Sequence, residues 1–255
     1  MVIIFLKMTL FVTKIVTAEY NFYMSITEFI KGELKGWGKT ERKVFPLGII
    51  LIAGISIYMH DITPAIISAI CGICATITAG KGKISCYFFG IISNLCYGYI
   101  SFENAFWGNL VLNMLYYLPM QFVGISQWKK HMKKETQVIY KTKLSLKERI
   151  LYFILISVLC VGGYYLLFAL EDSNPFMDSV TTILSVFAFL LTVKRCVEQW
   201  YVWTIVNALC VLMWLGAFMH GSHCFATVLM WSTYFVLGLY FLKNWNKELQ
   251  SESNS

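Results

Sequence analysis

The chain has 255 residues, of which 58% are hydrophobic and only 14% are charged, and it carries a formal net charge of +7. This composition leaves too few charged residues to cover an ordinary soluble domain, so it indicates a protein embedded in a membrane. The Lys and Arg residues are divided among several segments rather than gathered on one face, which argues against nucleic acid as a partner.

The first residues, Met1–Ala18, are apolar but include Lys7 and Lys14, whose spacing places both on one stripe of a helix. A basic stripe on an apolar helix is typical of a helix that lies in the membrane interface. A secretory signal peptide is the alternative, although no small-residue cleavage site precedes Glu19. We assign residues 1–43 to an N-terminal cytoplasmic or interfacial segment.

Eight apolar stretches without Lys or Arg follow, and most reach the roughly 20 residues that a helix needs to cross a bilayer. They are Val44–Met59, Ile62–Gly80, Ile84–Phe102, Asn104–Trp128, Ile150–Leu170, Phe176–Val193, Trp200–Met219 and Ser222–Leu242. The first stretch is the shortest and contains Pro46, so we expect it to be a short, tilted span at the edge of the helix bundle. The sequence thus predicts an all-α protein that crosses the membrane about eight times.

The 21 Lys and Arg residues predict the orientation of these spans. If the chain starts in the cytoplasm and the spans alternate, all of them fall in cytoplasmic segments, and the outer loops around Asp61, Glu103, Glu171 and Gly221 contain none. The positive-inside rule therefore predicts that both termini are cytoplasmic. The most basic loop, 129–149, is expected to be a solvated cytoplasmic segment.

The sequence contains an internal repeat. The string GKISCYFFGIISN, which ends at Asn94, aligns with KRCVEQWYVWTIVN, which ends at Asn207, at an offset of 113 residues. The same offset pairs Lys81 with Lys194. Both strings follow a predicted span and open the next one, so each marks the same place in one of two related units.

Further along the chain the offset becomes 117, because the outer loop of the second unit is longer. It pairs Tyr117 with Tyr234 and Trp128 with Trp245. Each repeat therefore contains three predicted spans.

One predicted span lies between the repeats and has a geometric role. Three spans reverse the direction of the chain, so a further crossing is needed before the second repeat can start on the same side as the first. The repeats are then parallel and related by an axis along the membrane normal, as in one group of transporters. The predicted organisation is a short first span at 44–61, a three-helix bundle at 62–128, the basic loop at 129–149, a linker helix at 150–171, a second three-helix bundle at 172–245 and a cytoplasmic tail at 246–255.

The sequence shows no catalytic or metal-binding set. The four His residues lie in predicted loops, and His220 and His223, which are three apart, lack a further ligand. Cys71 and Cys74 lie in mid-span, where a helix makes them a packing pair and not a redox motif. We therefore expect no enzyme activity, no metal and no cofactor.

The predicted spans do contain amide side chains. Asn94 and Asn207 lie near the bilayer centre at equivalent points of the two repeats, and Asn113 and Gln121 lie about 80° apart around one helix. A polar group in hydrocarbon is costly unless it meets a partner or a cavity. These residues are candidates to line a cavity, and the alternative is that they tie helices together.

Aromatic side chains share a stripe with one of these amides. Trp200, Trp203 and Asn207 follow helical spacing, and indole groups at mid-depth do not suit a lipid-facing surface. For Trp200 the alternative is an anchor in the membrane interface. Indole faces and amides together suit a flat, polar and cationic ring. The spans contain no deep carboxylate, which favours passive carriage over ion-coupled pumping.

Three stretches resemble the PnuC family of bacterial nicotinamide riboside transporters. They are AGKGKISCYFFGIISNLCYGYISF, GNLVLNMLYYLPMQFVGISQWKK and TTILSVFAFLLTVKRCVEQWYVWTIVNALCVLMW. The resemblance runs from about Ile66 to Lys247, and the string EQWxxWxxxN beginning at Glu198 is its most specific part.

The resemblance implies a 3+1+3 fold similar to that of SWEET sugar transporters, a homotrimer in the bacterial inner membrane, and facilitated uptake of nicotinamide riboside that phosphorylation inside the cell makes one-way. It also implies a set of substrate-binding residues drawn from both repeats. They are Trp200, Trp203, Asn207 and Tyr234 in the second repeat and Asn94, Asn113, Tyr117 and Gln121 in the first. A carrier of thiamine or riboflavin, a membrane enzyme and a receptor are the alternatives.

Overall fold

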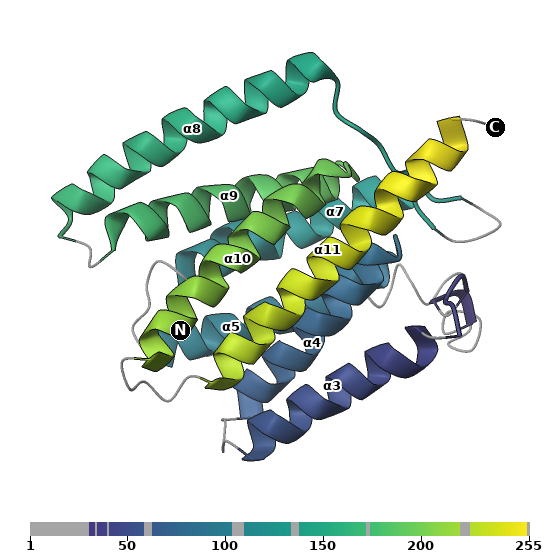
Figure 1. Cartoon of the computed structure of the whole chain (residues 1–255), viewed down its shortest axis with the longest axis horizontal. Helices are drawn as coiled ribbons and strands as arrows, with labels where there is room; N and C mark the ends of the chain where they lie inside the picture. The colour runs from purple at the N-terminus through teal and green to yellow at the C-terminus, as the bar shows by residue number, and fades with distance from the viewer. Residues whose placement is uncertain are drawn as a thin grey trace.

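The structure is a computed structural model, and it describes residues 31–33, 35–39, 41–58, 63–103, 110–133, 138–171, 174–219 and 225–253. Long helices dominate these residues and run side by side (Figure 1). The predicted interfacial helix in Met1–Ala18 and the outer-loop residues His60, His220 and His223 lie outside the described residues.

The helices begin and end within a few residues of the apolar stretches, with two exceptions. Their bounds are Glu41–Tyr58 (α3), Thr63–Gly80 (α4), Ser85–Glu103 (α5), Leu112–Tyr117 (η1), Leu118–Lys130 (α7), Leu146–Ala169 (α8), Pro175–Val193 (α9), Glu198–Met219 (α10) and Phe225–Ser253 (α11). The exceptions are η1, which is a π-helical turn within the predicted fourth span, and α11, which extends well beyond Leu242.

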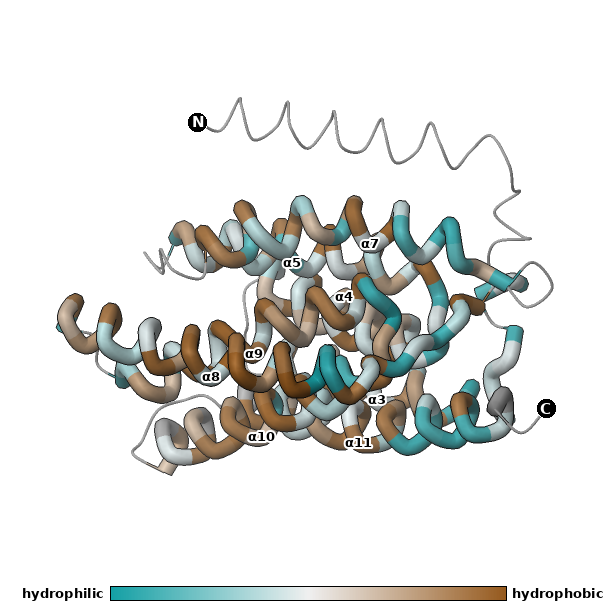
Figure 2. The backbone as a smooth tube through the Cα atoms, turned by 90° about the horizontal axis from the view of Figure 1, so that it is seen from above, coloured by the Kyte–Doolittle hydropathy of each residue, from teal (hydrophilic) through white to brown (hydrophobic). Residues whose placement is uncertain are grey.

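Length and apolar composition alone identify three candidate membrane spans among the described helices, namely α4, α8 and α9. The prediction of about eight crossings stays a prediction for the others. Hydrophilic residues gather at one end of the molecule, where α7 and α11 end (Figure 2). We call this the basic end, because the turns at Lys81 and Lys194 also lie there.

The helices form two groups of three. In the first bundle, α5 packs against both α4 and the η1–α7 segment, and in the second bundle α10 packs against α9 and α11. The bundles meet where α11 packs on α4 and α7 packs on α9. Seen from above, α5 and α7 lie on one side and α10 and α11 on the opposite side, with α4 and α9 between them (Figure 2). Helix α3 packs on α4 and α11.

Helix α8 lies at the outside of the molecule. It begins with a capping box, in which Ser145 and Glu148 bond to each other's backbone N–H groups, and this explains why it starts before the predicted Ile150. None of its residues is buried, and Phe153 is 73% exposed. An apolar helix with no buried residue suits lipid better than water.

Two tryptophans join the bundles at the basic end. The indole of Trp128 in α7 donates to the backbone carbonyl of Thr192 in α9, at 2.9 Å. The indole of Trp245 in α11 donates to the backbone carbonyl of Gly80 in α4, at 2.7 Å. Both indoles are fully buried. The last helix of each bundle is therefore tied to the first helix of the other, at the two positions that the 117-residue offset pairs.

The expectation that 129–149 is a solvated loop is wrong for its described part. Ile139 is fully buried, and its N–H donates to the carbonyl of Gly82 in the α4–α5 turn. The N–H of Thr142 donates to the carbonyl of Arg195 in the α9–α10 turn. Residues 138–145, which we call the basic strap, thus cross both bundles, because their few apolar side chains reach the core. Gly82 and Arg195 both have positive φ, at 67° and 63°.

The segment before α3 covers the turn between α4 and α5. The ammonium group of Lys83 is buried and donates to the carbonyl of Gly32, at 2.8 Å. Glu33 accepts from the hydroxyl of Ser85. Burial lowers the pKa of Lys83 and raises the pKa of Glu33, which opposes the charged form of each group. The first bundle therefore carries a cover that packs closely over its basic end.

Candidate functional site

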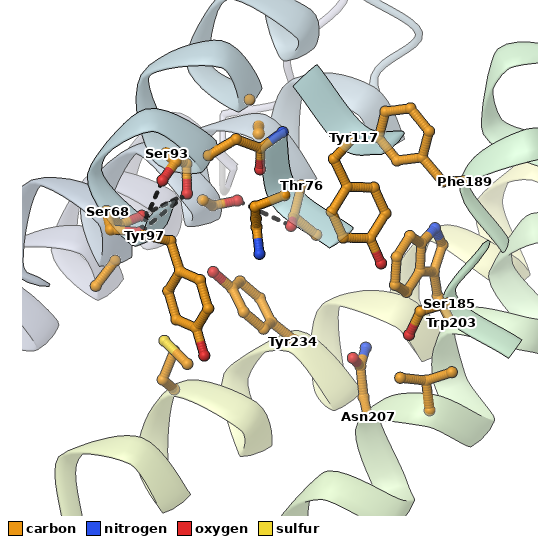
Figure 3. Close-up of a pocket in the computed structure, with 18 of the residues that line it drawn as sticks. Ser68, Thr76, Ser93, Tyr97, Tyr117, Ser185, Phe189, Trp203, Asn207 and Tyr234 are labelled. Carbon is orange, nitrogen blue, oxygen red and sulfur yellow. Dashed lines mark hydrogen bonds between the residues drawn. The ribbon is translucent and has the colours of Figure 1, made fainter. Parts of the chain in front are cut away.

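A cavity of about 590 Å³ lies between the two bundles, within the size range of small-molecule sites. All eight candidate residues from the sequence border it. They are Asn94, Asn113, Tyr117 and Gln121 from the first bundle and Trp200, Trp203, Asn207 and Tyr234 from the second. Figure 3 shows Tyr117 from η1 and Trp203 and Asn207 from α10 pointing toward the same space, with the Tyr234 hydroxyl directed toward the side of Tyr97 and Ser68.

The lining of the cavity contains no Lys, Arg, His, Asp or Glu among the described residues. It consists of aromatic rings, amides, hydroxyls and small apolar groups. Such a lining can stack on a ring and hydrogen-bond to hydroxyl or amide groups, and the aromatic faces can also attract a cation. It has no cationic group for an anion.

Helix α10 supplies the tryptophan and asparagine of one wall. The indole N–H of Trp203 donates to the hydroxyl of Thr192, at 3.2 Å, so the ring is held in place beside the cavity. Asn207 lies one turn further along and is 5% exposed. The two side chains therefore lie on the face that the sequence stripe predicts.

Trp200 lies deeper, at the basic end of the cavity. It is 3% exposed and packs against Phe241 and Trp245, with ring centroids 5.3 and 5.8 Å away. It is therefore not an anchor in the membrane interface. Its indole nitrogen has no hydrogen-bond partner within the described part of the chain.

The first bundle presents amides to the same cavity. The Nδ2 of Asn94 is buried and finds no hydrogen-bond partner among the described residues. Gln121, on α7, lies directly over Gly90 of α5, where an added Cβ would stand 2.4 Å from its Nε2. A buried amide without a protein partner is costly, and a ligand or a water molecule can supply one.

A π-helical turn, η1, forms the part of the cavity wall that directly precedes α7 in the chain. Asn113 and Tyr117 both belong to η1, and Asn113 is buried. The ring of Tyr117 lies 5.3 Å from that of Phe189 on α9, between centroids. Single π-helical turns often occur at functional sites, and no feature of the sequence revealed this one.

Sequence reasoning missed several lining residues. Tyr97, Ser185 and Phe189 reach the cavity, and so do Ser68 and Ser93, which hydrogen-bond to each other between α4 and α5 (Figure 3). Tyr97 was within reach of the analysis, because it lies three residues after Asn94 on the same helix face. Serine and phenylalanine are ordinary in membrane helices and gave no such signal.

The described residues include no group of three or more His, Cys, Asp or Glu that could hold a metal ion. The cysteines of the chain include Cys71 and Cys74 in α4, which are free thiols in the structure.

Comparison with known proteins also indicates a transporter of a small molecule. The family model described as nicotinamide mononucleotide transporter matches residues 63–247, which include every candidate residue. The nicotinamide riboside transporter PnuC of Neisseria mucosa is 32% identical over 238 residues, covering 90% of this chain and 89% of the relative. The nicotinamide riboside transporter PnuC of Haemophilus influenzae is 33% identical, covering 88% of this chain and 97% of the relative.

A solved structure also matches. The crystal structure of the vitamin B3 transporter PnuC superposes with a TM-score of 0.77 at 30% identity, covering 89% of this chain and 99% of the other. Together with the helical bundles and the uncharged cavity, these matches define a multi-pass membrane transporter and not an enzyme. The chain belongs to the PnuC family, which confirms the resemblance found in the sequence.

Proposed function

We propose that this protein carries nicotinamide riboside across the bacterial inner membrane by facilitated diffusion, and that phosphorylation inside the cell keeps the substrate there. The observation that carries the proposal is the uncharged cavity lined by aromatic, amide and hydroxyl groups. Nicotinamide riboside has a flat pyridinium cation, a carboxamide and ribose hydroxyls, and each of these matches one group in that lining.

The uncharged lining of the cavity also favours the riboside over the mononucleotide as the substrate. The family model is described by the mononucleotide, whereas the relatives are named for the riboside. A phosphate group carries negative charge and is bound in proteins by Arg, Lys or clustered backbone N–H groups. Since no Arg or Lys borders the cavity in the described residues, the riboside is the better substrate.

We assign a role to each of the eight candidate residues from the chemistry of its side chain and its position in the cavity wall. Trp203 stacks on the pyridinium ring, because its indole borders the cavity and is held there by the hydrogen bond to Thr192. Asn207 and Asn94 bond to polar substituents from opposite walls. Tyr117, Tyr234 and Gln121 complete the polar contacts, with Asn113 and Trp200 at the two ends of the site.

The transport mechanism follows from the proposed repeats. The residues at 62–128 and 172–245 form two parallel three-helix units joined by the linker helix at 150–171, and they move against each other to open the cavity to either side. The basic end faces the cytoplasm, and the protein is a homotrimer. The tie of each bundle to the first helix of the other, through Trp128 and Trp245, supports this pairing of the units.

The orientation has a direct test. A reporter fused after Lys247 should be cytoplasmic, and one placed near Glu171 or Gly221 should be external, because the Lys and Arg residues concentrate at the opposite end. A cytoplasmic signal from the Glu171 or Gly221 fusions would overturn both the orientation and the repeat assignment.

Energy coupling is tested in vesicles. The cavity lining has no carboxylate among the described residues, so we expect uptake to equilibrate without a sodium or proton gradient. The membrane potential still acts on a cationic substrate and must be set to zero. Sodium-dependent accumulation above the outside concentration at zero potential would refute facilitated diffusion.

The deciding experiment measures uptake of labelled nicotinamide riboside into proteoliposomes that contain only this protein. We expect uptake to the outside concentration without any kinase. Unlabelled riboside should compete, and the mononucleotide should not. Failure to take up the riboside, or stronger competition by thiamine, riboflavin or the mononucleotide, would contradict the proposed substrate.

A further inference from the structure

Two tyrosines of the cavity, Tyr117 on η1 and Tyr234 on α11, are paired by the repeat alignment. Each lies next to the first helix of the opposite bundle. The side chain of Ser185 of α9 lies beside the Tyr117 hydroxyl. The hydroxyl of Tyr234 lies over Gly72 of α4. Gly72 and Ser185 are themselves paired by the 113-residue offset. The contact of Tyr117 with Ser185 and the contact of Tyr234 with Gly72 therefore occupy equivalent places in the two repeats, but only Ser185 has a side chain that can hydrogen-bond.

The tightest contact at Gly72 is made by one atom, the hydroxyl oxygen of Tyr234. A Cβ added at Gly72 would stand 2.3 Å from the hydroxyl oxygen of Tyr234, a distance that real Cβ atoms essentially never show. The same Cβ would be 3.6 Å from the ring carbon Cζ, which is an ordinary contact. An alanine at position 72 therefore displaces the hydroxyl and leaves room for the ring.

The two hydroxyls differ in what the protein offers them. Tyr117 has the Ser185 side chain beside it. In the described part of the chain, the Tyr234 hydroxyl makes no hydrogen bond to a protein group, and glycine has no side chain that could supply one. The Tyr234 ring is held by the edge of Trp231, with centroids 5.7 Å apart. The ring is thus packed, and the side chain lies at the cavity (Figure 3).

A glycine in the middle of a helix is less favourable than alanine, so a role for it is expected at a buried contact. Packing alone does not explain Gly72, because alanine would fit against a phenylalanine ring at this place. It is the hydroxyl oxygen that requires glycine.

We propose that Gly72 is a positioning residue for substrate recognition, which holds the Tyr234 hydroxyl where it bonds to a hydroxyl or carboxamide group of the bound riboside. The inference rests on the proposed function for the identity of the ligand. It adds that the two equivalent tyrosines have different surroundings: Tyr117 has the Ser185 side chain beside its hydroxyl, and Tyr234 has the bare backbone of Gly72.

A double-mutant cycle tests this. Gly72→Ala, Tyr234→Phe and the double variant are purified in detergent, and their affinities for nicotinamide riboside are measured by calorimetric titration. Each single substitution should weaken binding about three- to tenfold, since one hydrogen bond is lost. The double variant should bind as Tyr234→Phe does, because Gly72 acts only through the oxygen that this variant lacks.

Melting temperature provides a readout that separates positioning from packing. Gly72→Ala should lower it through the clash with the hydroxyl, and adding Tyr234→Phe should restore it. Gly162→Ala is the matched control, because Gly162 lies in α8 with no atom within 4 Å of the added Cβ and should leave affinity unchanged.

The outcomes are distinct from those of the proposed function. If the wild-type protein does not bind the riboside, the proposed function fails, and this inference fails with it. If the wild type binds and Gly72→Ala either binds equally well or weakens binding as much in the Tyr234→Phe background, only this inference is overturned. It is also overturned if Gly72→Ala unfolds the protein and Tyr234→Phe does not rescue it.

Discussion

The two bundles share a frame and differ in what they present to the cavity. At the basic end they match closely: Gly82 and Arg195 occupy equivalent places with the same positive φ, and each accepts a hydrogen bond from the basic strap. Trp128 and Trp245 make equivalent bonds across the interface. The frame is therefore close to symmetric where the bundles are tied together.

The cavity walls are not symmetric. Gly90 in the first bundle is paired with Trp203 in the second, and Gln121 in the first is paired with Gly238 in the second. In the first bundle a glycine makes room for an amide, and in the second a large indole takes the equivalent place. An asymmetric wall suits a molecule with an aromatic ring at one end and hydroxyls at the other. A symmetric frame suits a movement of two equal units.

The largest expected effect tests the symmetry of the frame. Trp128→Phe and Trp245→Phe each keep an aromatic ring but leave a buried carbonyl without its donor, at a cost of about 1–3 kcal/mol. We expect similar falls in melting temperature from the two variants, measured by loss of the monodisperse peak on heating in detergent. Phe153→Leu, on the outward face of α8, is the control. A large effect from one tryptophan and none from the other would break the equivalence.

The second prediction tests the asymmetry of the walls. In Gly90→Ala the new Cβ would stand 2.4 Å from Nε2 of Gln121, whereas in Gly238→Ala it would stand 2.9 Å from Oγ1 of Thr204. Overpacking of this kind costs about 1–3 kcal/mol, and we expect Gly90→Ala to lie at the upper end. It should also weaken riboside binding more than Gly238→Ala, by calorimetric titration. Equal losses of affinity would show that Gln121 is not a substrate contact.

The third prediction concerns the tryptophan wall. Trp203→Ala should weaken riboside binding roughly 5- to 30-fold, about 1–2 kcal/mol, and Trp203→Phe should weaken it less because a smaller aromatic face remains. Asn207→Leu should lose a comparable amount, since it removes an amide from a dry site. If both Trp203→Ala and Asn207→Leu lower the melting temperature but bind with wild-type affinity, these residues serve packing and not recognition.

The smallest effect concerns Glu41, the first residue of α3, which contacts the α4–α5 turn of the first bundle through Lys81. Burial alone would raise the pKa of Glu41, but hydrogen bonds from Lys81, Tyr240 and the N–H of Gly38 outweigh it and hold the pKa below its ordinary value of 4.5. The stability that Glu41 contributes is therefore present above that pH and is lost as the pH falls through the lowered pKa.

We expect Glu41→Gln to reduce stability by about 1 kcal/mol at neutral pH, because the ion pair with Lys81 is partly buried but the amide can keep some of the hydrogen bonds. The difference in melting temperature between wild type and variant should be constant above pH 4.5 and shrink below it. Arg149→Gln, which breaks the pair with Glu198 in the second bundle, provides a comparison. A difference that grows on acidification would contradict the role given to Glu41.

The sequence predicted the helices and the family well, because long apolar stretches and an internal repeat are visible without a structure. The candidate residues were also found, since an asparagine or a tryptophan in mid-span is unusual in lipid. Asn94 and Trp203 stand out for this reason, and both border the cavity.

The features that the sequence did not reveal depend on contacts between segments that are distant in the chain. Gly72 is an ordinary small residue in a membrane helix until Tyr234 is seen against it. The loop 129–149 was expected to be solvated because it is the most basic loop of the chain, and only the fold shows Ile139 in the core. The π-helical turn at Leu112–Tyr117 leaves no pattern of its own in the apolar stretch.

The bonds of the two tryptophans also have a consequence for the synthesis of the protein. The Trp128 bond joins residues 64 apart in the chain, and the Trp245 bond joins residues 165 apart. The first bundle is translated early, but the carbonyl of Gly80 has no indole donor until α11 has left the ribosome. Nascent chains therefore pass through a long interval in which the first bundle is assembled and its basic end is still unfinished. Chains that terminate before α11 keep the carbonyl of Gly80 without this donor.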